Sequence, residues 1–518
     1  MPLAKSYAVS LLGLAGTIIE VEADISANLP NFILVGLPDA SLSEATSRVR
    51  AACANSDRPL PSKKITVNLS PASVPKSGSS FDLAIAAAIL AAQDPRIQLG
   101  IANCIHIGEL GLDGSVRPVS GVIPMLLAAR GAGFTRAIVP LGNLEEAHLA
   151  TGIEIFGCAS LSDLVSFHAG DSSVLSTSRT VEKPLIEHSI DGPDLADIVG
   201  QEDAVQALVV AAAGGHHFSM IGTPGSGKTM LAERFIGILP DLSPEDALEV
   251  TAIESLHAGH TGGIRTLNLR PRFQNPHHTA TVSAIVGGGS KLPRPGAASL
   301  AHNGVLFLDE ALEFQTPVLE SLREPLESGR ILIQRSAGAA IFPANFQLVL
   351  AANPCACGNF GSTKKHCECT YVARKRYLSR LSGPLLDRID IRLQIEPVSR
   401  LAKRVGNRES NPTTTTAKAK VRIQDARLAA ANRLQKVGLV RNSQVPGKLL
   451  RSDFQPPRDS IRALEVALDR GQISMRGFDR CLRLAWTIAD LEGTAFPSAS
   501  QVDQAMLLRG VESMEEWA

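Results

Sequence analysis

Short apolar runs mixed with helical stretches mark the first third of the chain. Residues 66–69 predict a strand, and the almost wholly apolar run at residues 81–92 predicts a buried helix. Residues 18–25 partly alternate between apolar and polar positions, as a half-buried strand does. We therefore expect one α+β domain over residues 1–169.

The middle of the chain has a different pattern. Apolar runs at residues 218–221, 305–308 and 347–351 are separated by helical stretches. This alternation is typical of a parallel sheet covered by helices. We therefore expect an α/β core over residues 194–399.

Helical spacing dominates the end of the chain, most clearly at residues 460–469, 476–491 and 500–509. This spacing predicts an all-α lid domain over residues 421–518. A length of 518 residues is also consistent with about three domains.

Two polar stretches without a sustained apolar period separate these domains. We expect a linker at residues 170–193. We also expect a flexible loop at residues 400–420, which contain a run of threonines.

The charge balance gives no overall direction to the choice of partners. Lysine plus arginine equals aspartate plus glutamate at 51 each, so any basic surface must be local.

An apolar run at residues 8–19 superficially resembles a signal peptide, but it lacks a small-residue cleavage site. No segment approaches the length of a membrane span. Eight cysteines are too few for a disulfide scaffold in so long a chain, and we expect a cytoplasmic protein.

A glycine-rich loop follows the apolar run at residues 218–221 and precedes a helix-forming segment. The loop consists of Gly222, Thr223, Pro224, Gly225, Ser226, Gly227, Lys228 and Thr229. This spacing satisfies GxxxxGK[ST], in which backbone N–H groups surround phosphate oxygens. Lys228 would meet the β- and γ-phosphates and Thr229 would ligate magnesium. The loop predicts an ATP site.

A pair of carboxylates ends the apolar run at residues 305–308. Ligands bind at the carboxyl ends of strands in open parallel sheets, so we expect Asp309 and Glu310 beside the phosphates. Asp309 would hold the magnesium ion and Glu310 would polarise the attacking water. The alternative is a strand followed by an acidic helix start, which the preceding phosphate-binding loop disfavours.

Three more polar residues follow the apolar runs of the core. Asn353 comes directly after a buried run, where its amide could position a water beside the γ-phosphate. Loop capping before Pro354 is the alternative. Arg388 and Arg476 are candidate cations for transition-state charge, with ordinary helix-surface arginines as the alternative.

Four cysteines lie close together in the sequence. Cys355 and Cys357 form one pair, and Cys367 and Cys369 form another after nine residues. Together they could supply four thiolates to one tetrahedral zinc ion, with free thiols as the alternative. We do not expect His366 to be a ligand. The other cysteines have no partner pattern and are expected to be buried: Cys53, Cys104, Cys158 and Cys481.

Two segments of the core could contact a charged polymer. Residues 331–334 and 340–343 predict a hairpin with Arg335 near its tip. A preceding insert carries basic residues without an acidic one and could meet phosphates, with a solvated loop as the alternative. Its basic residues are Arg270, Arg272, Lys291 and Arg294.

Together, these motifs make the whole chain resemble the magnesium-chelatase-like ATPases of the ComM/YifB type. Other segments that carry the resemblance are residues 28–30, 35–39, 68–72, 75–78, 81–83, 276–279, 287–289, 301–304, 378–390 and 487–491. The resemblance implies a P-loop AAA+ core. In such a core Asn353 would be the sensor-1 asparagine, Arg388 the arginine finger that acts on a neighbouring subunit, and Arg476 the sensor-2 arginine.

The same resemblance implies that the first domain has the fold of the Lon protease domain (ribosomal S5 domain 2-like). The alignment places Ser80 at the nucleophile, but Ile123 stands where the lysine base should be. A serine without its base is a weak nucleophile. We therefore predict a protease-like domain without protease activity.

The resemblance further implies a homo-oligomer, expected to be a hexameric ring, that uses ATP and Mg²⁺ and acts on single-stranded or branched DNA. Such a motor would be a helicase or branch-migration factor in recombination or natural transformation. One alternative is a chelatase-type ATPase that inserts a metal into a tetrapyrrole. The other is a protein-remodelling AAA+ machine or ATP-dependent protease. The isoleucine at position 123 disfavours this alternative.

Overall fold

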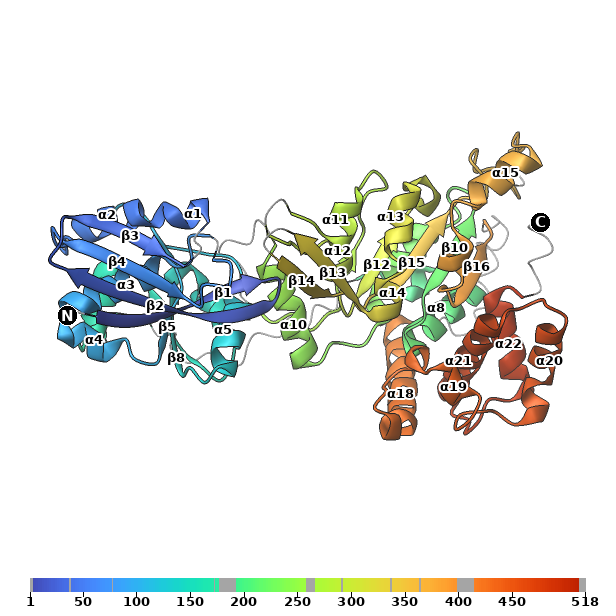
Figure 1. The fold of residues 1–518 in the computed structure, drawn as a ribbon. Coiled ribbons are helices and arrows are strands. Elements are labelled where there is room, and N and C mark those ends of the chain that lie inside the picture. The colour runs from blue at the N-terminus through green and yellow to red at the C-terminus, as the bar shows by residue number, and fades with distance from the viewer. Residues whose placement is uncertain are drawn as a thin grey trace.

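Three parts follow one another in space and along the chain: an N-terminal sheet, a central sheet and a helical C-terminal part (Figure 1). The computed structural model describes residues 3–36, 39–76, 78–171, 173–176, 192–257, 266–289, 292–335, 338–362, 365–397 and 414–511. Within these ranges, every helix is too short or too polar to cross a bilayer.

The N-terminal part is built on a mixed seven-stranded sheet in the order β3-β4-β2-β1-β5-β8-β9. Its strands are β1 (Leu3–Leu12), β2 (Ala15–Ser26), β3 (Asn31–Val35), β4 (Lys64–Ser70), β5 (Cys104–His106), β8 (Arg136–Pro140) and β9 (Glu154–Cys158), beside a small ladder of β6 (Glu109–Leu110) and β7 (Val116–Arg117). Its helices are α1 (Ala40–Ser43), α2 (Ala45–Asn55), α3 (Asp82–Gln93), α4 (Pro95–Gly100), α5 (Val122–Gly131), α6 (Leu144–Ala147) and α7 (Leu161–His168), with the 3-10 turn η1 (Leu141–Asn143). Strand β4 and the buried helix α3 confirm the two elements predicted at residues 66–69 and 81–92.

The central part contains a five-stranded sheet in the order β11-β12-β15-β10-β16, and every neighbouring pair is parallel. Its strands are β10 (Phe218–Gly222), β11 (Phe273–Gln274), β12 (Val305–Leu308), β15 (Gln347–Ala352) and β16 (Ile391–Ile395). Its helices and 3-10 turns are η2 (Leu195–Asp197), α8 (Glu202–Gly214), α9 (Lys228–Ile238), α10 (Pro244–Ser255), α11 (Val282–Val286), α12 (Ala297–Leu300), η3 (Ala311–Glu313), α13 (Thr316–Ser321), α14 (Pro325–Ser328), α15 (Tyr371–Leu378) and α16 (Gly383–Leu386). Strands β10, β12 and β15 confirm the three predicted runs, and the parallel arrangement brings their carboxyl ends to one edge.

A two-stranded hairpin stands beside this sheet. It is formed by β13 (Arg330–Arg335) and β14 (Gly338–Pro343), paired antiparallel from Arg330 with Pro343 to Arg335 with Gly338. This hairpin confirms the one predicted at residues 331–334 and 340–343.

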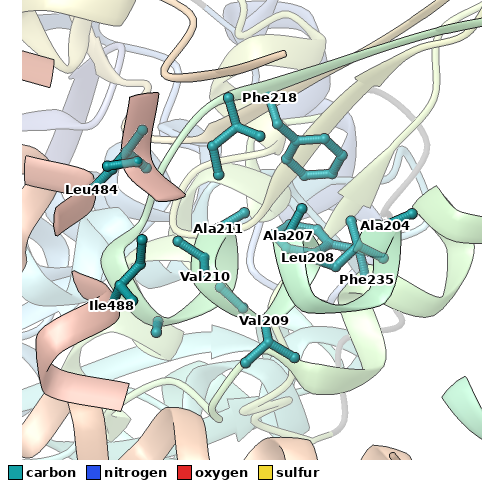
Figure 2. Close-up of a cluster of buried hydrophobic side chains, with 14 of the residues drawn as sticks. Ala204, Ala207, Leu208, Val209, Val210, Ala211, Phe218, Phe235, Leu484 and Ile488 are labelled. Atoms are coloured by element: carbon teal, nitrogen blue, oxygen red, sulfur yellow. The ribbon is translucent and has the colours of Figure 1, made fainter. Parts of the chain in front are cut away.

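The C-terminal part is helical, as predicted, and it shares a hydrophobic core with the central sheet. It contains α18 (Thr416–Leu434), η4 (Gln435–Val437), η5 (Asn442–Gln444), α19 (Gly447–Leu450), α20 (Arg458–Asp469), α21 (Met475–Glu492) and α22 (Ala499–Arg509). Leu484 and Ile488 of α21 belong to one buried cluster with Leu208 of α8 and Phe218 of β10 (Figure 2). Burial of this shared apolar surface holds the C-terminal helices against the central part.

Two predicted boundaries differ from the structure. Leu175 is 4% exposed within the N-terminal core, and Ser176 pairs with Gly157 of β9, so the predicted linker at 170–193 is wrong for its first residues. Helix α18 begins at Thr416, so the predicted loop at 400–420 is wrong from that residue on. The Thr415 side chain accepts a hydrogen bond from the backbone N–H of Lys418 at 3.3 Å, so the threonine run ends as a helix cap. Residues 177–191 of the first stretch and 400–413 of the second lie outside the described part of the chain.

Among the described residues, the N-terminal and central parts contact each other around α10 and at the β13–β14 hairpin. Ile123 of α5 packs with Leu149 and with Ala252 of α10 in a small apolar cluster. The turn that joins β1 to β2 meets the β13–β14 hairpin (Figure 1). A Cβ added at Gly338 would lie 2.9 Å from Leu12 Cδ2. The side chain at position 123 is therefore buried in an interdomain contact.

Candidate functional site

The glycine-rich loop joins β10 to α9 at the carboxyl edge of the central sheet. Gly225 and Gly227 adopt φ angles of 75° and 96°, where side chains are disfavoured. Helix α9 begins at Lys228, so its first backbone N–H groups lack intrahelical partners and border the loop. The sequence therefore builds a concave set of backbone donors that suits an anion.

Lys228 lies in the middle of this loop. Its side chain donates to the carbonyl oxygens of Gly222 at 2.6 Å and Thr223 at 3.1 Å, and to Asn353 Oδ1 at 3.3 Å. Burial lowers the pKa of Lys228, against the opposing effect of the carboxylates of Asp309 and Glu310. The structure thus brings Lys228 and Asn353 together although they are far apart in the sequence.

Two oxygen ligands meet beside the lysine. The hydroxyl of Thr229 donates to Asp309 Oδ2 at 2.8 Å, and the other Asp309 oxygen accepts the backbone N–H of Glu310 at 2.9 Å. Hydroxyl and carboxylate oxygens are the ligands that Mg²⁺ prefers. This pair fits a magnesium ion bound beside phosphates.

Glu310 follows Asp309 directly and has a backbone φ of 51°, a left-handed conformation that costs energy for a residue with a side chain. Its carboxylate lies at the same pocket as the loop, and the pocket has a volume of about 460 Å³. The pocket is lined by Pro224, Gly225, Gly227, Lys228, Thr229, Met230, Asp309, Glu310, Ala351, Ala352 and Asn353.

Two residues with no role in the sequence analysis contact this site. His278 Nδ1 lies 3.1 Å from Glu310 Oε2. The Gln201 amide donates to the carbonyl of Ser226 in the loop at 2.7 Å and to that of Glu396 beyond β16 at 3.2 Å. The sequence signal for His278 was only its place in the segment at residues 276–279. Gln201 had no signal beyond its position before α8.

Arg388 and Arg476 lie together on a second cleft, which has a volume of about 700 Å³. Arg388 is mostly buried, donates to the carbonyl of Pro384 at 2.5 Å and forms an ion pair with Glu327. Arg476 lies at the exposed N-terminal end of α21. Arg441, Arg480 and Arg483 line the same cleft, together with the carboxylates of Glu327, Asp387, Asp390 and Asp479.

The arginine cleft and the phosphate loop lie at opposite ends of the central sheet. The cleft is bordered by His217, Gln347 and Asp390, which stand at the amino ends of β10, β15 and β16. The loop follows the carboxyl end of β10. A five-residue strand spans about 13 Å, and neither arginine lines the phosphate pocket of its own chain.

The four clustered cysteines converge after Asn353. Their sulfur atoms all lie within 4.8 Å of one another, and His366 is not part of the group. The pKa of the Cys357 thiol is lowered to about 6, mainly by a hydrogen bond from the backbone N–H of Asn359 and to a smaller extent by one from Cys355. The remaining cysteines are buried, as predicted: Cys53, Cys104, Cys158 and Cys481.

Some of the basic side chains predicted to contact a charged polymer make contacts within the chain instead. Arg272 pairs with Glu254 at 2.7 Å, and Lys291 lies outside the described residues. Arg335 donates to the carbonyl of Gly289 at 2.8 Å, which ties the hairpin to the segment after α11. DNA contact by these segments stays a prediction.

A parallel α/β sheet with a phosphate-binding loop and an acidic pair at its carboxyl edge defines a nucleotide-binding class of protein. Sequence families described as magnesium chelatase subunit ChlI match residues 21–143 and 194–402, and the ChlI C-terminal family matches residues 413–509. The uncharacterized protein Rv2897c of Mycobacterium tuberculosis is 46% identical over 98% of this chain and 99% of its own. The competence protein ComM of Haemophilus influenzae is 38% identical over 95% and 94%, and the uncharacterized protein YifB of Escherichia coli is 38% identical over 99% and 98%.

The chain therefore belongs to the magnesium-chelatase-like family that contains ComM and YifB. This family is of the ATPase class and implies the use of ATP and Mg²⁺. Its members are typically oligomeric.

Proposed function

We propose that this protein is a cytoplasmic AAA+ ATPase that works as a homo-oligomeric ring, expected to be a hexamer, and moves DNA. The observation that carries the ATPase proposal is the convergence of Lys228, Thr229, Asp309, Glu310 and Asn353 on one pocket. Each offers the kind of group that phosphoryl transfer requires: an ammonium, two oxygen ligands for magnesium, a carboxylate base and a polar amide.

The residues take the following roles in this proposal. The Lys228 ammonium exchanges its bonds to loop carbonyls for bonds to the β- and γ-phosphates. Thr229 and Asp309 hold Mg²⁺, which neutralises phosphate charge when bound. Glu310 accepts the proton of the attacking water, and Asn353 orients that water.

The cationic group that stabilises the charge of the transition state comes from a second chain. Arg388 and Arg476 share a cleft at the amino ends of the strands, and the phosphate loop of the same chain is at the carboxyl ends. A head-to-tail contact brings the cleft of one subunit to the loop of the next. Arg388 then acts as the arginine finger and Arg476 as the sensor-2 arginine of the neighbouring site.

DNA is the proposed substrate, in a helicase or branch-migration role during recombination or natural transformation. The support is the full-length similarity to a protein named competence protein ComM. A chelatase-type ATPase for metal insertion into a tetrapyrrole and a protein-remodelling machine are the alternatives.

The N-terminal part is proposed to have the Lon-protease-like fold without peptidase activity. Ile123 has a hydrocarbon side chain, which provides no base for Ser80, and it is fully buried against Leu149 and Ala252. We expect the protein to leave fluorogenic peptides intact. Peptide hydrolysis that disappeared in Ser80→Ala would contradict this proposal.

ATP and Mg²⁺ are the proposed reacting cofactors. A zinc ion at Cys355, Cys357, Cys367 and Cys369 is proposed as a structural one, because four converging thiols form a closed tetrahedral ligand set with no open position for water.

The test is steady-state ATP hydrolysis without nucleic acid, with single-stranded DNA and with forked DNA, with Lys228→Ala as the zero. Stimulation by DNA supports the motor proposal. ATP hydrolysis at one unchanged rate in all three conditions would contradict DNA as the substrate, and the alternatives would then be tested with a tetrapyrrole or an unfolded protein.

A further inference from the structure

The spacing of the clustered sulfur atoms matches a single tetrahedral metal ion. Cys355 Sγ lies 3.3 Å from Cys357 Sγ and 3.7 Å from Cys367 Sγ, and the last two sulfurs are 3.6 Å apart. A tetrahedron with Zn–S bonds of about 2.3 Å has edges of about 3.8 Å. Disulfide sulfurs would be about 2 Å apart. The cluster is therefore arranged as a ligand set for one ion.

The loop around the cluster is held by contacts of its own. The backbone N–H of Phe360 donates to Cys355 Sγ at 3.4 Å. The Arg374 guanidinium of α15 lies 4.0 Å from the centre of the Phe360 ring. Cys369 directly precedes Thr370, whose side chain caps α15. The four ligands thus join the loop after β15 to the start of α15.

One turn of this loop touches the phosphate-binding loop directly. Gly358 has a φ of 75°, and a Cβ added there would lie 2.8 Å from Cγ and 2.9 Å from Cδ of Pro224. Only a glycine backbone can approach the proline ring so closely. Asn353, which contacts Lys228, stands two residues before the first ligand. The loop after β15, which carries the cysteines, therefore borders the phosphate pocket on the sides of Pro224 and Asn353.

We infer that zinc binding at the four cysteines controls nucleotide affinity, because the metal holds the turn at Gly358 against Pro224 and fixes the chain that carries Asn353. This inference rests on the ATP site and the zinc ion of the proposed function. When zinc binds, each thiol that still carries a proton releases it to solvent, and four Zn–S bonds form. Without the metal, the turn loses its anchor and the phosphate loop loses the neighbour that packs on it.

Because linked equilibria are reciprocal, the inference can be tested in the unaltered protein. Zinc content is first measured by elemental analysis, with about one zinc per chain expected. A zinc-selective chromogenic chelator then competes for the metal with and without a non-hydrolysable ATP analogue and Mg²⁺. We expect the analogue to tighten zinc binding by about tenfold, and Lys228→Ala to abolish that effect. Fewer than about one zinc per four chains would overturn the inference, as would identical competition with and without the analogue.

The converse measurement uses the double variant Cys367→Ser/Cys369→Ser and a fluorescent ATP analogue. We expect its Kd for the analogue to rise by about tenfold, whereas Cys53→Ser, which removes a buried thiol outside the cluster, keeps both zinc and affinity. Equal affinity of the double variant and the unaltered protein contradicts the inference. The assays contain no DNA, so failure of the DNA proposal leaves them unaffected. Failure of the unaltered protein to bind the analogue at all would instead refute the ATP site.

Discussion

The imidazole of His278 lies 3.1 Å from the carboxylate of Glu310, at the outer edge of the phosphate pocket. The histidine comes from the segment between β11 and α11, and the glutamate follows β12. Since β11 and β12 are paired in the sheet, the two side chains are held near each other by the fold. We therefore expect His278 to position Glu310, the proposed general base.

Replacement of His278 by alanine is expected to lower kcat for ATP by about 10- to 100-fold, because a misplaced base loses alignment with the attacking water. Affinity for a non-hydrolysable analogue should stay within about twofold, since the histidine does not line the pocket. His277→Ala is the matched control, because the His277 ring lies against that of His278, and it is His278 that pairs with Glu310. Equal rates for the two variants would contradict a positioning role.

Mutation of the two carboxylates of the acidic pair should have different effects. Glu310→Gln is expected to bind ATP and lose hydrolysis by at least about 100-fold, because only the proton acceptor is removed. Asp309→Asn should in addition weaken the Mg²⁺ dependence of nucleotide binding, since Asp309 pairs with the Thr229 hydroxyl. Titration of a fluorescent analogue at several Mg²⁺ concentrations distinguishes them. If both variants shifted the Mg²⁺ midpoint equally, the assigned division of roles would be incorrect.

The arginine cleft predicts rescue between two inactive variants. Lys228→Ala lacks a working phosphate loop and Arg388→Ala lacks the finger, and each alone should lose about a thousandfold in kcat. In a random equal mixture, about a quarter of the contacts pair an intact loop with an intact arginine. ATPase activity near that fraction of the unaltered protein is expected. Lys228→Ala mixed with Glu310→Gln, both damaged in the same half-site, serves as the control and should stay inactive. A mixture of assembled but inactive rings would show that Arg388 does not act across a contact.

Acid should destabilise the N-terminal part through a buried histidine pair. His168 Nε2 lies 2.9 Å from His106 Nε2, and burial lowers the pKa of His168 from 6.5 to about 4. Because the pKa is lower in the folded state, the unfolded state takes up the proton first as the pH falls. The stabilisation is thus complete above pH 6.5 and decreases by about 3 kcal/mol towards pH 4.

His168→Gln should reduce this pH dependence. The free energy of unfolding of both proteins is measured by denaturant titration between pH 7 and pH 4. His366→Gln, at an exposed position, should keep the full dependence. Identical slopes for His168→Gln and the unaltered protein would exclude the histidine pair as the cause.

Local chemistry made much of the central part predictable. The glycine-rich loop requires left-handed glycines and a following helix, and the buried strands are continuous apolar runs, so both are visible in sequence. The position of the carboxylates after β12, beside the loop, follows from the parallel arrangement that the alternating pattern predicts. The loop and the strands themselves depend on neighbours in the chain.

Relationships between distant elements could not be read in the same way. The contact of His278 with Glu310 depends on the pairing of β11 with β12, and β11 is only two residues long. The placement of Arg476 and Arg388 on one cleft depends on how α21 packs on the central sheet. The start of α18 was missed because threonine is common both in loops and in helix caps.

In the proposed head-to-tail assembly, the two half-sites of each chain lie at opposite ends of one sheet, and this determines how many complete sites an assembly contains. A row of chains joined head to tail leaves one loop without an arginine at its first end and one arginine without a loop at its last. An open arc therefore contains one fewer complete site than it has chains, and an isolated chain contains none. Only closure removes the deficit, so specific activity per chain should rise with protein concentration and reach its plateau when the arc becomes a circle.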